Sequence, residues 1–102
     1  MFDRDGRLSP RAAVSRAVSR SVARQTKQIL GQIDKHLKAA GTSKAKLLTA
    51  NIWLTDIRGF AEMNEVWDAW VSPGNTPARA TVQATLAGPQ FLVEIMVTAA
   101  LD

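Results

Sequence analysis

The sequence TPARATVQATLAGPQFLVEI (Thr76–Ile95) decides the fold of this chain. It contains two runs rich in aliphatic and β-branched residues, separated by Ala87–Gln90, whose Gly-Pro pair is typical of a turn. The two runs predict strands over Ala78–Leu86 and Phe91–Ala99. The short connection between them predicts that these strands pair as a hairpin.

Each run contains one charged residue where a core is expected, Arg79 in the first and Glu94 in the second. By the two-residue period of a strand, Glu94 shares its face with Leu92 and Met96. The other face of this strand consists of Val93, Ile95 and Val97. Because both faces are apolar, we expect Glu94 to be desolvated. Such a carboxyl group either has a raised pKa that suits acid–base chemistry or is satisfied by backbone or a nearby cation. The residues alone leave both interpretations open.

Length and composition bound the class of protein. With 102 residues and 46% hydrophobic content, the chain predicts one domain with a modest core, which often gains stability by forming oligomers. It has no cysteine, which excludes disulfides and thiolate metal sites. It shows neither a membrane-length apolar run nor the apolar stretch of a secretory signal, so we expect a soluble cytoplasmic protein.

The positive charge of the chain is confined to its start. The net charge is +4, and residues 1–25 alone account for it with six arginines and two aspartates. From Thr26 onward the cationic and anionic side chains balance, and lysine, which is missing before that point, becomes the commoner cation. This break in composition marks residues 1–24 as a different kind of sequence from residues 25–102.

Apolar residues at steps of three and four predict an amphipathic helix over Val22–Ala40. Gly41 follows, at the place where a helix C-terminus favours a left-handed residue. His36, the single histidine, falls on the polar face of this helix, where we expect a solvated surface residue. The next element, Leu47–Leu54, is short and rich in β-branched and aromatic residues, which predicts a buried strand.

A second helix is predicted over Arg58–Val71, with Asp56 as its cap. Its stripe of residues at helical spacing consists of Phe60, Met63, Asn64, Trp67 and Trp70 or Val71. We interpret Trp67 and Trp70 as core or subunit-interface anchors rather than as platforms for nucleic-acid bases. The order of helix, strand, helix and hairpin predicts an α+β fold with two helices packed on one face of a sheet.

Several linked motifs resemble those of the RidA family, also called YjgF-like proteins, and in particular its short RidA-like subgroup. Pro77-Ala78-Arg79 and Val93-Glu94-Ile95 are similar to the P-A-R and V-E-I motifs of that family, at the family's separation. The upstream matches, in the family's order, are Gln25–Leu30 (QTKQIL), Leu54–Ile57 (LTDI), Phe60 and Met63–Trp67 (MNEVW). The resemblance covers about residues 25–101.

The resemblance implies a chorismate-mutase-like α+β fold that assembles as a homotrimer with clefts between neighbouring subunits. It also implies a 2-iminoacid (enamine/imine) deaminase, which hydrolyses reactive 2-imino acids to 2-oxo acids and ammonia without a metal or cofactor. Arg79 would hold the substrate carboxylate, and Glu94 would position and activate the attacking water. Thr81, where relatives often have cysteine, would contribute through its backbone. The partners implied are a 2-imino acid or another carboxylate ligand, with neither a membrane nor a nucleic acid expected.

Residues 1–24 depart from that family pattern. Relatives have a β-hairpin before the first helix, with a tyrosine and a Ser-Gly or Ala-Gly pair in the cleft, and this chain contains no tyrosine. The repeats in RAAVSRAVSRSVAR predict only a backward extension of the first helix, with Val14, Val18 and Val22 on one face. The hairpin is therefore expected to be missing or replaced, and its loss would leave a sheet edge exposed and one cleft wall absent.

Three explanations of residues 1–24 remain open. The first is loss of the original strands through an altered reading frame or a misplaced start. The second is an organellar targeting peptide, which Asp3 and Asp5 argue against. The third is a basic arm for RNA or an acidic surface. The alternative to the deaminase is accordingly a non-catalytic protein that binds a carboxylate or contacts RNA.

Overall fold

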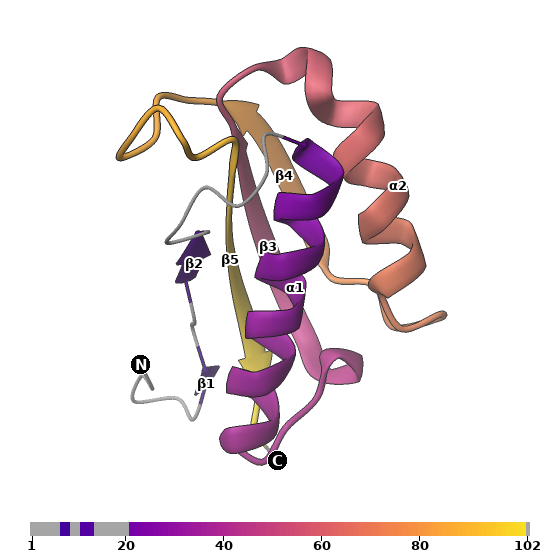
Figure 1. Cartoon of the computed structure of the whole chain (residues 1–102). Coiled ribbons are helices and arrows are strands. Elements are labelled where there is room, and N and C mark those ends of the chain that lie inside the picture. Colours follow the sequence, from indigo (N-terminus) through magenta and orange to yellow (C-terminus); the bar gives the residue numbers. More distant parts are fainter. Residues whose placement is uncertain (1–6, 9–10, 14–20, 102) are drawn as a thin grey trace.

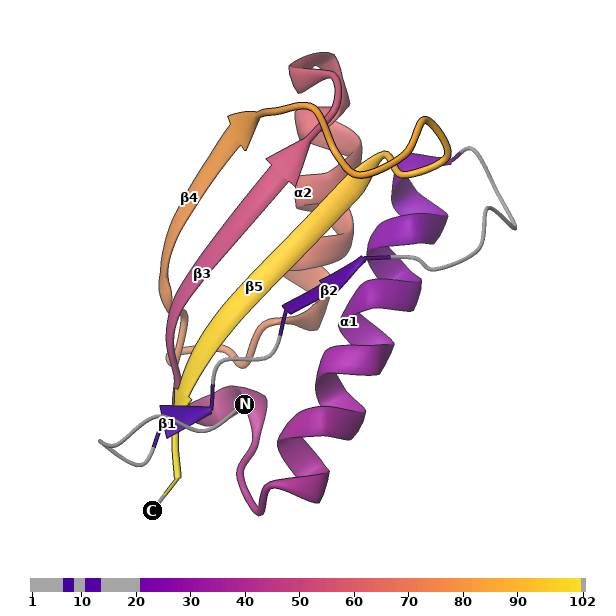
Figure 2. The ribbon, with the colours of Figure 1, turned by 90° about the vertical axis from the view of Figure 1, so that its left-hand side faces the viewer.

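The computed structural model describes residues 7–8, 11–13 and 21–101. Two helices cover one face of a mixed sheet (Figures 1 and 2). The elements are β1 (Arg7–Leu8), β2 (Arg11–Ala13), α1 (Val22–Ala39), η1 (Lys44–Lys46), β3 (Leu47–Leu54), η2 (Ile57–Gly59), α2 (Phe60–Trp70), β4 (Ala78–Gln83) and β5 (Val93–Ala100). This arrangement confirms the predicted α+β fold.

The boundaries of the helices and of β3 follow from local chemistry. Ser21 is the N-cap of α1, where its side chain accepts from the backbone N–H of Arg24 at 3.3 Å. Gly41 ends that helix with φ at +81°, a conformation that glycine adopts readily. Asp56 caps η2, because its carboxylate accepts from the backbone N–H of Arg58 at 2.9 Å. The predicted helices and the predicted strand Leu47–Leu54 are thus confirmed, apart from small shifts at the ends of the two helices.

The predicted hairpin of the last two strands is wrong. In the sheet, β3 lies between β4 and β5, parallel to β4 and antiparallel to β5. The connection from β4 to β5 passes over the end of β3, where Ala84 N–H donates to the carbonyl of Leu54 (2.8 Å) and Thr55 N–H donates to the carbonyl of Leu92 (3.1 Å). A period of two residues shows that a segment is a strand, but it does not identify the neighbouring strand. Here α2 forms the crossover that parallel pairing of β3 and β4 requires.

The start of the chain also differs from its prediction. Residues 7–8 and 11–13 form strands rather than a backward extension of α1, which begins at Val22. Both strands run antiparallel to β5 in one common register, from Arg7 opposite Ala100 to Ala13 opposite Glu94. Within the described residues, these two strands pair with β5 and not with each other. Both strands form hydrogen bonds along the edge of β5. They therefore cover part of an edge that was expected to be exposed.

The core lies between the helices and one face of the sheet. Its fully buried residues come from both helices, the second half of β3 and the length of β5; they are Ile29, Leu30, Ile33, Leu37, Ile52, Leu54, Met63, Val93, Ile95, Val97 and Ala99. The predicted burial of one face of the last strand is therefore confirmed. The other face of the sheet is uncovered in the single chain, where Val82 is 50% exposed. His36 is exposed, as predicted.

Gln25 ties α1 to the connection that precedes β5. Its side chain is completely buried, and both ends of its amide are used. Nε2 donates to the carbonyl of Gln90 at 2.9 Å, and Oε1 accepts from the backbone N–H of Leu92 at 2.8 Å. One side chain thus satisfies two backbone groups of an irregular segment, which fixes the point where β5 begins.

We predict that Gln25→Leu lowers the free energy of unfolding by about 2–3 kcal/mol, because it leaves these two backbone groups without partners. Urea denaturation at one fixed protein concentration would measure the change. The control is Gln28→Leu, at an exposed position of the same helix. Equal stability of the two variants would contradict the assigned role of Gln25.

Candidate functional site

Arg79 extends from β4 toward α2 and is half-buried there. Its Nη1 donates to Oδ1 of Asn64 at 2.5 Å. Its guanidinium carbon lies 5.5 Å from the ring centroids of both Phe60 and Trp67, within the range of cation–π contacts. Among the residues that the structure describes, no carboxylate forms an ion pair with Arg79. The guanidinium is therefore held in place with most of its five N–H donors unused.

Asn64 is itself held in one orientation. Its Nδ2 donates to a carboxylate oxygen of Asp68, one helical turn further along α2, at 3.2 Å. Because the amide nitrogen is used in this way, Oδ1 faces Arg79. A neutral amide thus positions the guanidinium without cancelling its charge, which remains available for an anionic ligand.

Thr81 lies two residues beyond Arg79 on β4 and therefore shares its face of the sheet. Its Oγ1 is buried and has no hydrogen-bond partner within the described part of the chain. Buried hydroxyl groups in native proteins are usually satisfied, so this one is a candidate contact for a water or a ligand. The sequence predicted only a backbone role for Thr81, which stays a prediction.

Glu94 lies on the opposite face of the sheet from Arg79. Across the strands, Arg79 is level with Ala50 of the core, whereas Glu94 is level with Trp53 and Val82 of the uncovered face. Glu94 is half-buried, because no layer covers this face in the single chain. One chain therefore does not bring Arg79 and Glu94 together, although sequence reasoning assigned them to one site.

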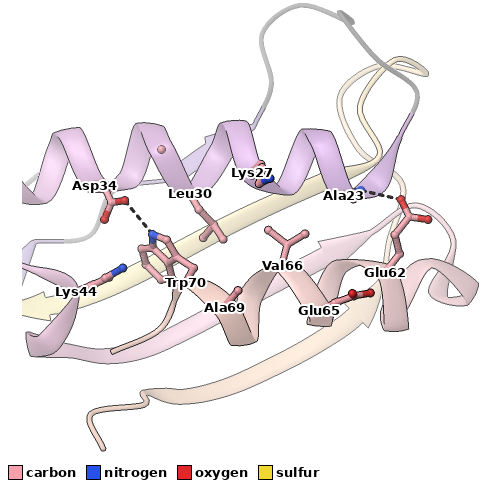
Figure 3. Close-up of a pocket in the computed structure, with 11 residues that line it drawn as sticks. Ala23, Lys27, Leu30, Asp34, Lys44, Glu62, Glu65, Val66, Ala69 and Trp70 are labelled. Carbon is pink, nitrogen blue, oxygen red and sulfur yellow. Dashed lines mark hydrogen bonds between the residues drawn. The ribbon is translucent and has the colours of Figure 1, made fainter. Parts of the chain in front are cut away.

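A groove of about 540 Å³ between α1 and α2 is a further candidate site, which sequence reasoning missed (Figure 3). Its lining residues are Ala23, Lys27, Leu30, Gly31, Asp34, Lys44, Glu62, Glu65, Val66, Ala69 and Trp70. The glycine in the middle of α1 is the one signal in the sequence that could have indicated it. The other lining residues look like ordinary surface and boundary positions until the two helices are packed together.

Near the start of α2, the carboxylate of Asp56 forms an exposed ion pair with Arg58 at 2.6 Å. The side-chain hydrogen bonds from Arg58 hold the pKa of Asp56 down to about 2. Both groups help to form the turn into α2, and neither belongs to the Arg79 cluster or to the groove.

The described residues offer neither a metal site nor a membrane-spanning helix. No group of three or more histidine, aspartate or glutamate side chains there is arranged to hold a metal ion. None of the described helices is both long and apolar enough to cross a membrane.

Known proteins resemble the chain both in sequence and in structure. The family model described as Endoribonuclease L-PSP matches residues 6–101. A RutC family protein of Haemophilus ducreyi is 43% identical over 84 residues, which are 82% of this chain and 72% of the relative. The RutC family protein YoaB of Escherichia coli is 48% identical over 77 residues, which are 76% of this chain and 68% of the relative.

Two solved structures have the same fold. A putative translation initiation inhibitor from Salmonella typhimurium has a TM-score of 0.89 and 41% identity, over 94% of this chain and 83% of that one. NMB1025 of Neisseria meningitidis, a member of the YjgF protein family, has a TM-score of 0.89 and 44% identity, over 95% of this chain and 81% of that one. The resemblance seen in the motifs is thereby confirmed, and the chain belongs to the YjgF family, whose matching model is described as Endoribonuclease L-PSP.

Proposed function

We propose that the protein is a 2-iminoacid deaminase, which hydrolyses 2-imino acids to 2-oxo acids and ammonia without a metal or cofactor. The observation that carries the proposal is the Arg79 cluster. A half-buried guanidinium held by Asn64, Phe60 and Trp67, with no anionic partner among the described residues, suits a ligand carboxylate. The resemblance of the motifs around Arg79 and Glu94 to those of the RidA family implies the same activity.

Arg79 would bind the substrate carboxylate through two parallel N–H donors, a geometry that lysine does not offer. The rings of Phe60 and Trp67 limit rotation of the guanidinium and exclude water from two sides, which strengthens the ion pair. The substrate would then be held by its invariant end, the carboxylate, while its side chain varies.

Glu94 would act as the proton carrier. Its carboxylate takes a proton from water as the water oxygen attacks the imine carbon, and the C=N bond becomes a C–N single bond. The carboxyl group then gives the proton to nitrogen. In the resulting carbinolamine, the hydroxyl proton passes through Glu94 to the nitrogen; the C–N bond then breaks, ammonia leaves, and the C=O group of the 2-oxo acid forms. Water supplies every atom that is added.

Since Arg79 and Glu94 lie on opposite faces of one sheet, we place the proposed site between chains, with Arg79 from one copy and Glu94 from another. The uncovered face of the sheet supports such packing, because it exposes the apolar side chain of Val82. The proposed assembly is a homotrimer. Each neighbouring pair of subunits would then form one site.

The second candidate is a protein that binds carboxylates without turnover. It is favoured by the fact that the Arg79 cluster is complete within one chain and does not need Glu94. An RNA-contacting role would depend on the six arginines of residues 1–24, half of which (Arg4, Arg16 and Arg20) lie outside the described residues, so the deaminase remains the better supported proposal.

We predict that Glu94→Gln lowers kcat by about 10²- to 10⁴-fold, the usual contribution of a positioned acid–base group. KM should change little, because Arg79 still binds the carboxylate. The assay follows iminoleucine, generated by an amino-acid oxidase, in competition with semicarbazide. Wild-type hydrolysis no faster than buffer, with 2-oxo acid binding retained, would leave the binding protein as the better account.

A site shared between chains predicts complementation. Arg79→Ala and Glu94→Gln should each be inactive, but refolding them together at equal amounts should restore about a quarter of wild-type activity, because mixed neighbours rebuild intact sites. The same assay measures the gain, and separately refolded variants mixed afterwards are the control. Absence of recovery from mixed trimers would contradict the shared site.

Asn64→Asp should raise KM by about tenfold, because a carboxylate beside Arg79 would compete with that of the substrate. Asn64→Ala should have a smaller effect on KM, since it removes one contact but leaves the positive charge. Comparison of both variants in the imine assay separates charge from positioning. A KM for Asn64→Asp equal to that of wild type would show that Arg79 does not bind the carboxylate.

A further inference from the structure

The groove between α1 and α2 is lined by side chains from both helices. Its floor consists of Leu30, Val66 and Ala69, which belong to facing rows of the two helices (Figure 3). Its volume of about 540 Å³ is within the range of small-molecule sites in proteins. Arg79 and Glu94 do not line it, so it is separate from the proposed deaminase site.

Trp70 closes one end of the groove and is fixed there by three contacts. Its Nε1 donates to Asp34 at 2.9 Å, and the ammonium of Lys44 lies 5.3 Å from its ring centroid. Its ring also packs against Trp67 at 5.4 Å. The charges of Asp34 and Lys44 are thus used to hold an aromatic end wall in one position, ready for an apolar group to pack against it.

Gly31 lies on the α1 side of the groove, in the middle of a helix. A Cβ built there would meet nothing within 4 Å, so packing within the described residues does not require glycine at this position. Glycine nevertheless weakens a helix interior relative to alanine. Its effect here is to keep the cavity open and its backbone accessible.

Two charges at the sides of the groove have no partner among the residues that the structure describes. Lys27 projects from α1 and Glu65 from α2, on opposite walls (Figure 3). Both are exposed, and neither forms a hydrogen bond or ion pair with another described residue. Glu62, further along α2, is by contrast used, because its carboxylate accepts from the backbone N–H of Ala23 at 2.8 Å. An unpaired cation and an unpaired anion therefore lie on either side of an apolar floor.

We propose that this groove binds an α-amino acid with a large apolar side chain. The ligand carboxylate would pair with Lys27 and its ammonium with Glu65. Its side chain would lie along Leu30 and Val66 toward the ring of Trp70. A zwitterion matches the two unpaired charges, whereas a purely anionic or purely cationic ligand leaves one of them facing a like charge.

The test is calorimetric titration of the full chain with L-phenylalanine, beside 3-phenylpropanoate, which lacks the ammonium, and 2-phenylethylamine, which lacks the carboxylate. We expect saturable binding of L-phenylalanine, and binding at least fivefold weaker for each analogue. Lys27→Gln and Glu65→Gln should each weaken it by about fivefold, the effect of one partly exposed ion pair.

The blocking variant is Gly31→Leu, which adds a side chain at the groove from a position where a Cβ meets nothing within 4 Å, and it should raise Tm because leucine favours a helix interior over glycine. It should abolish binding, whereas its control Gln28→Leu, on the same helix but outside the groove, should not change it. No saturable binding to wild type, equal binding to Gly31→Leu, or tightest binding of either single-charge analogue would overturn the proposal. Loss of binding in Arg79→Ala but not in Gly31→Leu would overturn it too, because the ligand would then occupy the Arg79 cluster.

Discussion

The pairing of β3 with both β4 and β5 decides where every candidate functional side chain points. Because β3 lies between these strands, its register aligns Arg79 with the buried Ala50 and aligns Glu94 with Trp53 on the uncovered face. The two charges are thereby fixed on opposite sides of one sheet. The segment between β4 and β5 crosses the end of β3, which lets β3 lie between these two strands. Hydrogen bonds from Gln25 and from the end of β3 fix this segment in place. A single deaminase site from these residues therefore requires a second copy of the chain.

Much of the fold could be predicted from the sequence, because local patterns depend on few neighbours. The strand Leu47–Leu54, the helix that ends before Gly41 and the buried face of Val93, Ile95 and Val97 all follow from residue spacing and backbone preference. The pairing of the last two strands could not be predicted in this way. A Gly-Pro connection between two alternating runs favours a hairpin, but the parallel pairing of β3 and β4 depends on where α2 packs, which is a property of the whole core.

The candidate site, like the fold, could be predicted from the sequence only in part. Arg79 and Glu94 are conspicuous in the sequence, because charges interrupt apolar runs there. The surroundings of Arg79 were less evident, although Phe60, Asn64 and Trp67 occur at steps of four and three residues and were predicted to share one helical stripe. The sequence does not show that this stripe packs beside β4. There the two aromatic rings and the amide contact the guanidinium of Arg79. Sequence reasoning missed the groove because its one signal, Gly31, is a residue without a side chain. Its contribution is open space beside the helix rather than a chemical group that a sequence pattern would show.

Helix α2 contributes to both candidate sites, and this arrangement has a physical consequence. Its side toward β4 supplies Asn64 and Trp67 to the Arg79 cluster, while its side toward α1 supplies Glu65, Val66 and Trp70 to the groove. The two indoles touch, with ring centroids 5.4 Å apart, so Trp70 packs on the ring that lies over Arg79. A ligand that presses on Trp70 would therefore act on the side chain that limits rotation of the guanidinium. Packed side chains transmit such displacements, because a close-packed interior has little free volume to absorb them. The contact between the two tryptophans thus provides a direct physical connection between two sites that share no lining residue.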